Sequence, residues 1–206
     1  MDWKVAKEEL SRKLDPAHVK GRKQGGGQVQ YIEGWHAISE ANRIFGFGAW
    51  DRETVDLRQL GEPREVDGKA RVDYMARVRI TIWGGEDGRT IRDGCGFGQG
   101  IDKDVGQAHE SALKEAETDA MKRALMTFGN PFGLALYDKT RADVGVDASP
   151  AEVASAVENI NAAATLEALQ ATFGGYYRNA RHVADHPTVV AAKDQRKLQL
   201  TRERTA

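Results

Sequence analysis

Alanine recurs at every fourth position between Ala108 and Ala124, in a segment without proline or glycine. This spacing places five small side chains on one face of a helix. A helix with such a face can approach a flat surface closely. The pattern therefore predicts a long helix from near Val105 to Phe128 that packs on a sheet.

The residues that precede this helix indicate the sheet. Apolar and polar side chains alternate without a break through RVDYMARVRITIW, residues 71–83, which is typical of a strand with one buried face. Residues 50–60 and 89–97 read as strands on either side of it, and GGEDG marks a hairpin turn. The fold class is therefore α+β, with a three-stranded antiparallel β-meander packed on the long helix. A short strand and a helix over residues 28–46 precede this β-β-β-α core.

Composition divides the chain into three parts. Residues 1–24 combine an amphipathic helix with a basic linker, VKGRK, which leads into a flexible glycine break. Residues 25–142 form the core, which contains the predicted sheet and long helix. Residues 143–206 are alanine-rich and predict two or three short helices, interrupted at Gly174-Gly175 and near Pro187. This small helical module could cap the core or bind a partner.

Glycine occupies every second position from Gly94 to Gly100, on one face of the third strand. Such a face suits close packing of a helix or a second subunit, and it would also admit a ligand. No GK[ST] motif follows, so the run lacks the lysine of a phosphate loop. Because nothing in the sequence resembles an activated nucleophile, we expect neither an enzyme nor a cofactor. The alternative is an enzyme that binds a nucleotide at the glycine-rich run, and a nucleotide-binding titration would test it.

The cysteine and histidine content of the sequence gives little indication of a disulfide or a metal site. The single cysteine, Cys95, excludes an intramolecular disulfide and a cysteine-pair zinc site. His36 and His109 lack the spacing of a metal pair, and we expect both at the surface. Ion pairs at i, i+4 explain the acidic residues of the long helix without acid–base catalysis: Glu110, Glu115, Glu117 and Asp119.

Local basic clusters, rather than the total charge, point to nucleic acid. The formal net charge is -1, so any such function depends on where the cations lie. The neighbours Lys122 and Arg123 could simply complement the dipole at the end of the long helix. With other residues they could instead form a basic groove with stacking surfaces. Those residues are Lys103, Lys139, Arg71, Arg77, Arg79, Phe47, Trp50 and Trp83.

Three segments resemble the core of the Rad-fifty-two family of single-strand annealing proteins: YIEGWHAISEANRIFGFGAW, the strand block that ends in GCGFGQG, and KEAETDAMKRALMTFGN followed by LYDK. The resemblance implies rings or related homo-oligomers that lay single-stranded DNA in a groove and anneal complementary strands in recombination and repair, without nucleotide hydrolysis. It implies that Lys122 and Arg123 contact the DNA backbone. Lys103 and Lys139 would serve a second, outer DNA path.

Three positions depart from the family pattern. His36 stands where relatives carry an arginine, Phe47 where they carry a tyrosine, and Met126 where a basic residue is expected. Either the groove is weaker in this chain, or it recruits Arg43, Arg77 or Arg79 instead. An Arg43→Ala variant tests that hypothesis.

The resemblance also sets expectations about partners and location. Expected partners are single-stranded DNA, further copies of the chain and, through the C-terminal helices, other recombination or replication proteins. The charged start of the chain has no signal-peptide core, and no apolar run could span a bilayer, so we expect a soluble cytoplasmic protein that contacts no membrane. Chain length favours a bacterial or phage type; a eukaryotic one would be nuclear or organellar. A scaffold of a recombination complex with weak DNA binding is the alternative function.

Overall fold

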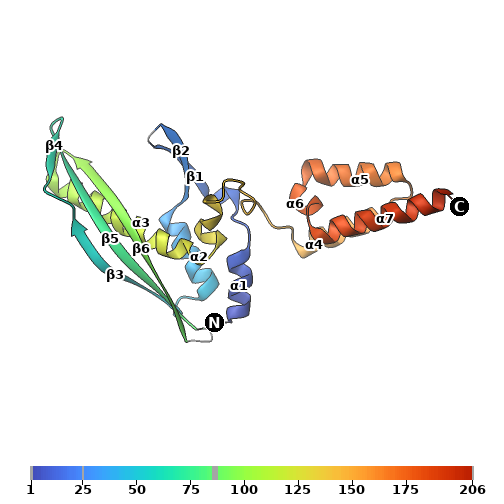
Figure 1. Cartoon of the computed structure of the whole chain (residues 1–206), viewed down its shortest axis with the longest axis horizontal. Helices are drawn as coiled ribbons and strands as arrows, with labels where there is room; N and C mark the ends of the chain where they lie inside the picture. Colours follow the sequence, from blue (N-terminus) through green and yellow to red (C-terminus); the bar gives the residue numbers. More distant parts are fainter. Residues whose placement is uncertain (1, 25, 85–87, 206) are drawn as a thin grey trace. The chain divides into compact units, whose positions relative to one another are not determined.

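The computed structural model describes residues 2–24, 26–84 and 88–205. The chain forms two compact units, Met1–Val144 and Gly145–Ala206 (Figure 1). Most of the predicted GGEDG turn, residues 85–87, lies outside the described residues. Within the described ranges, no helix is long and apolar enough to cross a membrane.

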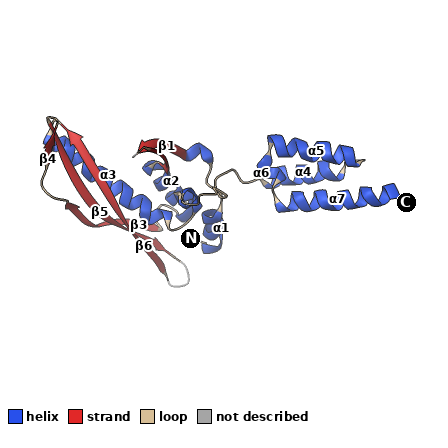
Figure 2. Cartoon of the chain, turned by 45° about the horizontal axis from the view of Figure 1, so that its top comes forward, coloured by secondary structure: helices blue, strands red, loops and turns tan. Residues whose placement is uncertain are grey.

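The sheet of the first unit is centred on β5 (Lys69–Trp83), shown in Figure 2. Along one edge, β5 pairs antiparallel with β3 (Trp50–Gln59) and then with the short β4 (Arg64–Val66). Along the other edge it pairs over its whole length with β6 (Arg89–Asp102). The predicted antiparallel meander is confirmed, and β4 is an addition that the sequence did not indicate.

The long helix α3 (Val105–Met126) covers one face of this sheet (Figure 1). Its alanine face is fully buried against the alternate glycines of β6. A Cβ atom on Gly98 would lie 2.0 Å from the carbonyl oxygen of Ala112, and one on Gly100 would lie 1.7 Å from that of Ala108. The glycine run therefore serves helix-on-sheet packing, one of the alternatives that the sequence left open.

The N-terminal segment belongs to the same core. The helix α1 (Trp3–Ser11) buries Ala6 and Leu10, and a 3₁₀ turn (Pro16–His18) follows. The prediction of a basic linker is wrong, because VKGRK lies in strand β1 (Val19–Gln24). This strand pairs antiparallel with β2 (Gly27–Ile32). Gly26, with φ of 82°, provides the left-handed backbone that a tight hairpin needs in place of a flexible break.

The predicted helix before the sheet is confirmed as α2 (Gly34–Phe45), but its buried face differs from the expected one. Trp35 is 61% exposed, whereas Ala37, Ala41, Ile44 and Phe45 are buried. The ring of Phe45 lies 5.6 Å from that of Phe128 and 5.9 Å from that of Phe132. These aromatic partners, far along the chain, decide which side of α2 faces the core.

The second unit contains four helical segments, α4 (Pro150–Asn161), α5 (Leu166–Asn179), α6 (Arg181–Ala184) and α7 (Pro187–Thr205). They enclose a core of their own. The predicted break at Gly174-Gly175 is wrong, since α5 continues through both glycines. Packing of Leu169, Phe173 and Tyr176 offsets the roughly 1 kcal/mol that each glycine costs in a helix. The predicted boundary at Pro187 is confirmed.

Candidate nucleic-acid interface

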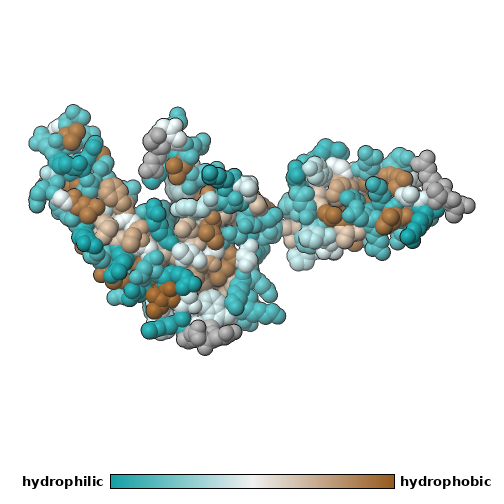
Figure 3. All heavy atoms as spheres, in the orientation of Figure 1, coloured by the Kyte–Doolittle hydropathy of each residue, from teal (hydrophilic) through white to brown (hydrophobic). Residues whose placement is uncertain are grey.

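A groove lies between the β1–β2 hairpin and the flank of α3 that runs beside the edge of β6. The edge of β6 and the segment 132–137 complete its walls, and it encloses about 910 Å³. Figure 3 shows the hollow between the projecting hairpin and the sheet–helix layer. A concave surface lined by both aromatic and charged side chains is the natural place to look for a ligand.

Cations outnumber carboxylates along this groove. Its cationic lining residues are Arg22, Lys23, Lys114, Lys122 and Arg123. Its carboxylates are Glu115 and Asp119. The formal excess is three positive charges, in a chain whose net charge is -1. A concentrated positive field of this kind attracts a polyanion even when the whole protein is nearly neutral.

Lys122 lies half-buried on one wall, with its Nζ atom 5.5 Å from the centroid of the Tyr31 ring. Burial lowers the pKa of Lys122, and the nearby charges of Arg22 and Arg123 lower it further, against the opposing effect of Asp119 and Glu115. The Arg22 guanidinium lies 5.7 Å from the same ring. An anion placed here would relieve the crowding of positive charge.

Arg123 is exposed and paired within its own helix. Its Nε donates to Asp119 Oδ2 at 2.9 Å, which raises the pKa of Arg123. Lys114 pairs with Glu110 in the same i, i+4 pattern. The predicted helical ion pairs are confirmed at these two positions.

The two lysines assigned to an outer DNA path lie elsewhere. Lys103 is exposed just before α3, and Lys139 is exposed after the 3₁₀ turn Leu134–Leu136. Phe47 is 86% exposed in the turn between α2 and β3. None of the three is among the described residues that line the groove, and their contact with DNA stays a prediction.

Arg77 and Arg79 project from the opposite face of the sheet. Side chains alternate along β5, and Val78 between them is buried toward α3. Arg79 donates to Asp93 of β6 at 2.9 Å. The two arginines therefore cannot join Lys122 in this groove.

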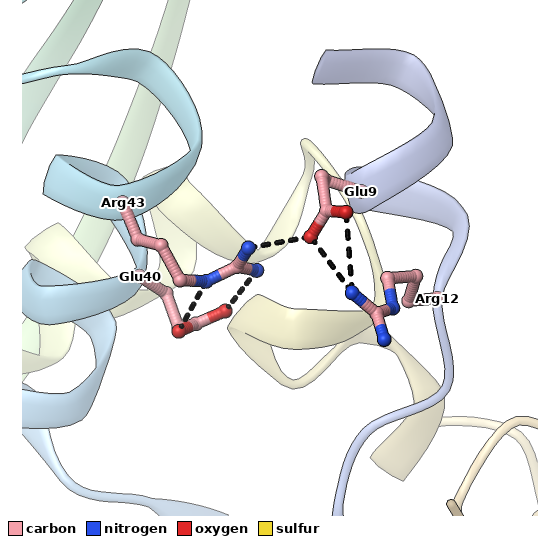
Figure 4. A network of polar contacts seen from close by, with 4 residues as sticks. All are labelled: Glu9, Arg12, Glu40 and Arg43. Carbon is pink, nitrogen blue, oxygen red and sulfur yellow. Dashed lines mark hydrogen bonds and ion pairs between the residues drawn. The ribbon is translucent and has the colours of Figure 1, made fainter. Parts of the chain in front are cut away.

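Arg43 links two helices, as Figure 4 shows. Its guanidinium donates to Glu40 within α2 and to Glu9 of α1, and Glu9 also pairs with Arg12. The hydrogen bonds that Arg43 donates to Glu40 and Glu9 raise the pKa of Arg43, and the bond to Glu9 lowers the pKa of Glu9. The geometry gives Arg43 a structural role away from the described groove lining.

The expectation that His36 lies at the surface is wrong. Its side chain is 6% exposed, and its ring stacks on that of His18, with centroids 4.0 Å apart and planes 16° apart. Burial lowers the pKa of His36, and the neighbouring His18 adds to this effect. His109 is half-buried as well and pairs with the Tyr74 hydroxyl at 3.1 Å.

The sequence interpretation missed the hairpin side of the groove. Arg22 and Tyr31 enter it from β1 and β2, and the edge of β6 at Phe97 and the segment at Tyr137 line it further along. The basic run before a glycine turn, followed by the alternating QVQYI, was the signal for a hairpin that presents cations. Among the described residues, no group of three or more His, Cys, Asp or Glu side chains could hold a metal ion.

Comparison with known proteins gives the same family as the sequence motifs. The chain is 39% identical over 143 residues to the DNA repair and recombination protein rad22 of Schizosaccharomyces pombe, covering 67% of this chain and 29% of that protein. It is 41% identical over 137 residues to the DNA repair and recombination protein RAD52 of Eremothecium gossypii, covering 64% of this chain and 29% of that protein. The corresponding protein of Saccharomyces cerevisiae is 38% identical over 133 residues.

The chain thus spans less than a third of the length of these relatives. They come from eukaryotes, and the bacterial or phage type stays a prediction. A family model described as the Rad52/22 family double-strand break repair protein matches residues 2–153, which include every residue of the groove. The chain therefore belongs to the Rad52/22 family.

Proposed function

We propose that this protein binds single-stranded DNA in the groove and promotes annealing of complementary strands in DNA repair and recombination, without nucleotide hydrolysis. The observation that carries the proposal is the formal excess of three positive charges in one groove of a chain with a net charge of -1. The relatives described above are DNA repair and recombination proteins, which agrees with the proposal.

The chemistry follows from the lining residues. Lys122, Arg123 and Arg22 would neutralise phosphates irrespective of sequence, so that two polyanionic strands can approach each other. Tyr31 and Tyr137 offer ring surfaces on which bases can stack. Annealing requires the remaining base edges to stay exposed for pairing, and an open groove permits this.

We further propose that copies of the chain associate into a ring or filament. Because the glycines of β6 face α3, the intervening residues project from the opposite face of the sheet. Ile91, Phe97 and Ile101 are 37%, 51% and 46% exposed there. Exposed apolar side chains on one face of a sheet suit a protein–protein contact, and repetition of the groove would multiply the DNA contacts. Light scattering of the purified protein would measure its mass.

A scaffold of a recombination complex with weak DNA binding is the second candidate. The second unit favours it, because residues 154–206 lie beyond the family match and form a separate helical core. Such a unit offers a surface for other recombination or replication proteins.

The deciding experiment is annealing of two complementary labelled oligonucleotides without ATP, across a salt series. The Lys122→Ala/Arg123→Ala variant should lose the acceleration, and its single-strand salt slope should fall by about 1.4 for two lost phosphate contacts. A Lys4→Ala/Lys7→Ala variant is the control. It removes the same charge from exposed positions of α1, outside the described groove lining.

Two results would count against the proposal. Annealing at full rate by the groove variant, in a correctly assembled oligomer, would remove Lys122 and Arg123 from the site. No acceleration by the folded wild-type protein would favour the scaffold.

A further inference from the structure

Two carboxylates lie among the cations of the groove and pair with them. Asp119 accepts from Arg123 Nε at 2.9 Å. Glu115 Oε1 lies 3.9 Å from Arg22 Nη1, so it faces a cation of the opposite wall. The cations that would meet phosphates are therefore partly neutralised by α3 itself.

The backbone of β6 fixes these carboxylates in position. Among the described strands, β6 pairs only with β5, so the N–H groups along its other edge have no strand partner. Glu115 Oε2 accepts from Gln99 N at 3.1 Å, and Asp119 Oδ2 accepts from Phe97 N at 3.4 Å. Four residues apart on one helix, the two side chains lie on the same side and about 6 Å apart along the axis.

We propose that Glu115 and Asp119 act as internal substitutes for DNA phosphates, which compete with a bound strand for Arg22 and Arg123 and thereby speed its release. The inference rests on the proposed function, because it describes how single-stranded DNA dissociates from the same groove. In the free protein the carboxylates hold the guanidinium groups in place. In the complex they remain tethered to β6, beside the phosphates.

Annealing gives this competition a purpose. A groove that held each strand too tightly would keep the bases from sampling partners and would retain the duplex product. A carboxylate that already lies beside the guanidinium lowers the affinity for the strand. It also takes the place of each phosphate at the guanidinium as the strand dissociates.

The competition also has a salt signature. When a phosphate displaces Asp119 from Arg123, the freed carboxylate takes up a cation from solution. Uptake offsets part of the counterion release that drives single-strand binding. Removal of the carboxylate charge should therefore make binding tighter and more steeply dependent on salt.

The test compares Asp119→Asn with Asp93→Asn. Each amide keeps an oxygen that can accept a hydrogen bond, so the Phe97 N–H retains a partner in the first variant. Asp93 is a matched control, because its ion pair with Arg79 has the same 2.9 Å separation and its side chain is 32% exposed, against 31% for Asp119. Asp93 lies across the sheet from the groove.

The probe is a fluorescent oligo-dT strand, which cannot pair with itself, and anisotropy and stopped-flow dissociation are the readouts. Asp119→Asn should bind about two- to fivefold more tightly, the range for one exposed ion pair, and should dissociate correspondingly more slowly. Its salt slope should steepen by up to about 0.7. Asp93→Asn should leave all three quantities near their wild-type values. Glu115→Gln is a second variant with the same expected direction.

Three results would overturn the inference. Equal shifts in Asp119→Asn and Asp93→Asn would show only a general charge effect, while the proposed function would stand. Weaker binding by Asp119→Asn and Glu115→Gln, with unchanged unfolding and oligomeric mass, would show that the carboxylates organise the groove without competing. A wild-type protein that neither binds oligo-dT nor anneals would remove the proposed function and the inference together.

Discussion

The Nζ atom of Lys122 lies 5.5 Å from the centroid of the Tyr31 ring. Lys122 projects from α3 and Tyr31 from β2, so the contact joins the two main walls of the groove. Arg22 of β1 lies 5.7 Å from the same ring. A single aromatic side chain thus positions two cations that come from distant parts of the sequence.

Replacing Tyr31 by leucine should weaken binding of single-stranded DNA by about two- to fivefold, since an exposed cation–π contact is worth roughly 0.5–1 kcal/mol. Tyr31→Phe should retain wild-type affinity, because the ring face and not the hydroxyl meets Lys122. Anisotropy at fixed salt measures both. Equal losses in the two variants would assign the effect to the hydroxyl.

Arg43→Ala should leave single-strand affinity unchanged and lower the free energy of unfolding. Arg43 joins α1 to α2 through Glu9 and Glu40, and its side chain is 45% exposed. Partly exposed ion pairs contribute up to about 1 kcal/mol each, so we expect a loss of roughly that size. Urea unfolding beside a binding titration separates the two effects. Lost affinity in a stable variant would return Arg43 to the DNA site.

The elements with strong periodicity could be predicted from the sequence. Alternation in β5 and the alanine spacing of α3 reflect burial against each other, so each pattern carries its own signal. The buried face of α2 could not be predicted in the same way, because it depends on Phe128 and Phe132, which only the folded chain brings to Phe45. The strand β1 is exposed along much of its length and is polar, and so has no apolar period to detect.

The residues of the candidate site likewise fall into those that the sequence predicted and those that it did not. Lys122 and Arg123 were found because they are neighbours in a helix with recognisable motifs. Arg22 and Tyr31 were missed because hairpin pairing, not sequence proximity, brings them to α3. Arg77 and Arg79 were grouped with Lys122, although alternation with the buried Val78 already placed them on the other face of the sheet.

Gly98→Ala should destabilise the protein by about 3 kcal/mol, near the upper end for an overpacked core. The new Cβ atom would lie 2.0 Å from the carbonyl oxygen of Ala112, which is helix backbone and cannot rotate away. Gly48→Ala is the control, because no atom lies within 4 Å of its added Cβ. Urea unfolding of both variants gives the comparison. Similar stabilities would mean that α3 can lift from β6 at little cost.

The stacked histidines predict that acid weakens the fold. Burial, followed by the neighbouring His18, lowers the pKa of His36 below its ordinary value of 6.5; Arg43 adds to this effect, while Glu40 and Asp15 oppose it. Below pH 6.5 His36 therefore becomes protonated in the unfolded chain before it does so in the folded chain. The free energy of unfolding falls as the pH falls toward the pKa of His36 in the folded chain.

Urea unfolding between pH 7.5 and 5 measures this loss. The range stays above 4.5, so that Glu9, whose pKa is lowered from that value, contributes little. A His36→Phe variant keeps a flat ring against His18 but cannot titrate, and its stability should depend less on pH than that of the wild type. A steeper profile in His36→Phe would mean that the folded protein prefers the protonated ring. His36 would then carry a positive charge on α2, as the arginine of the family pattern does.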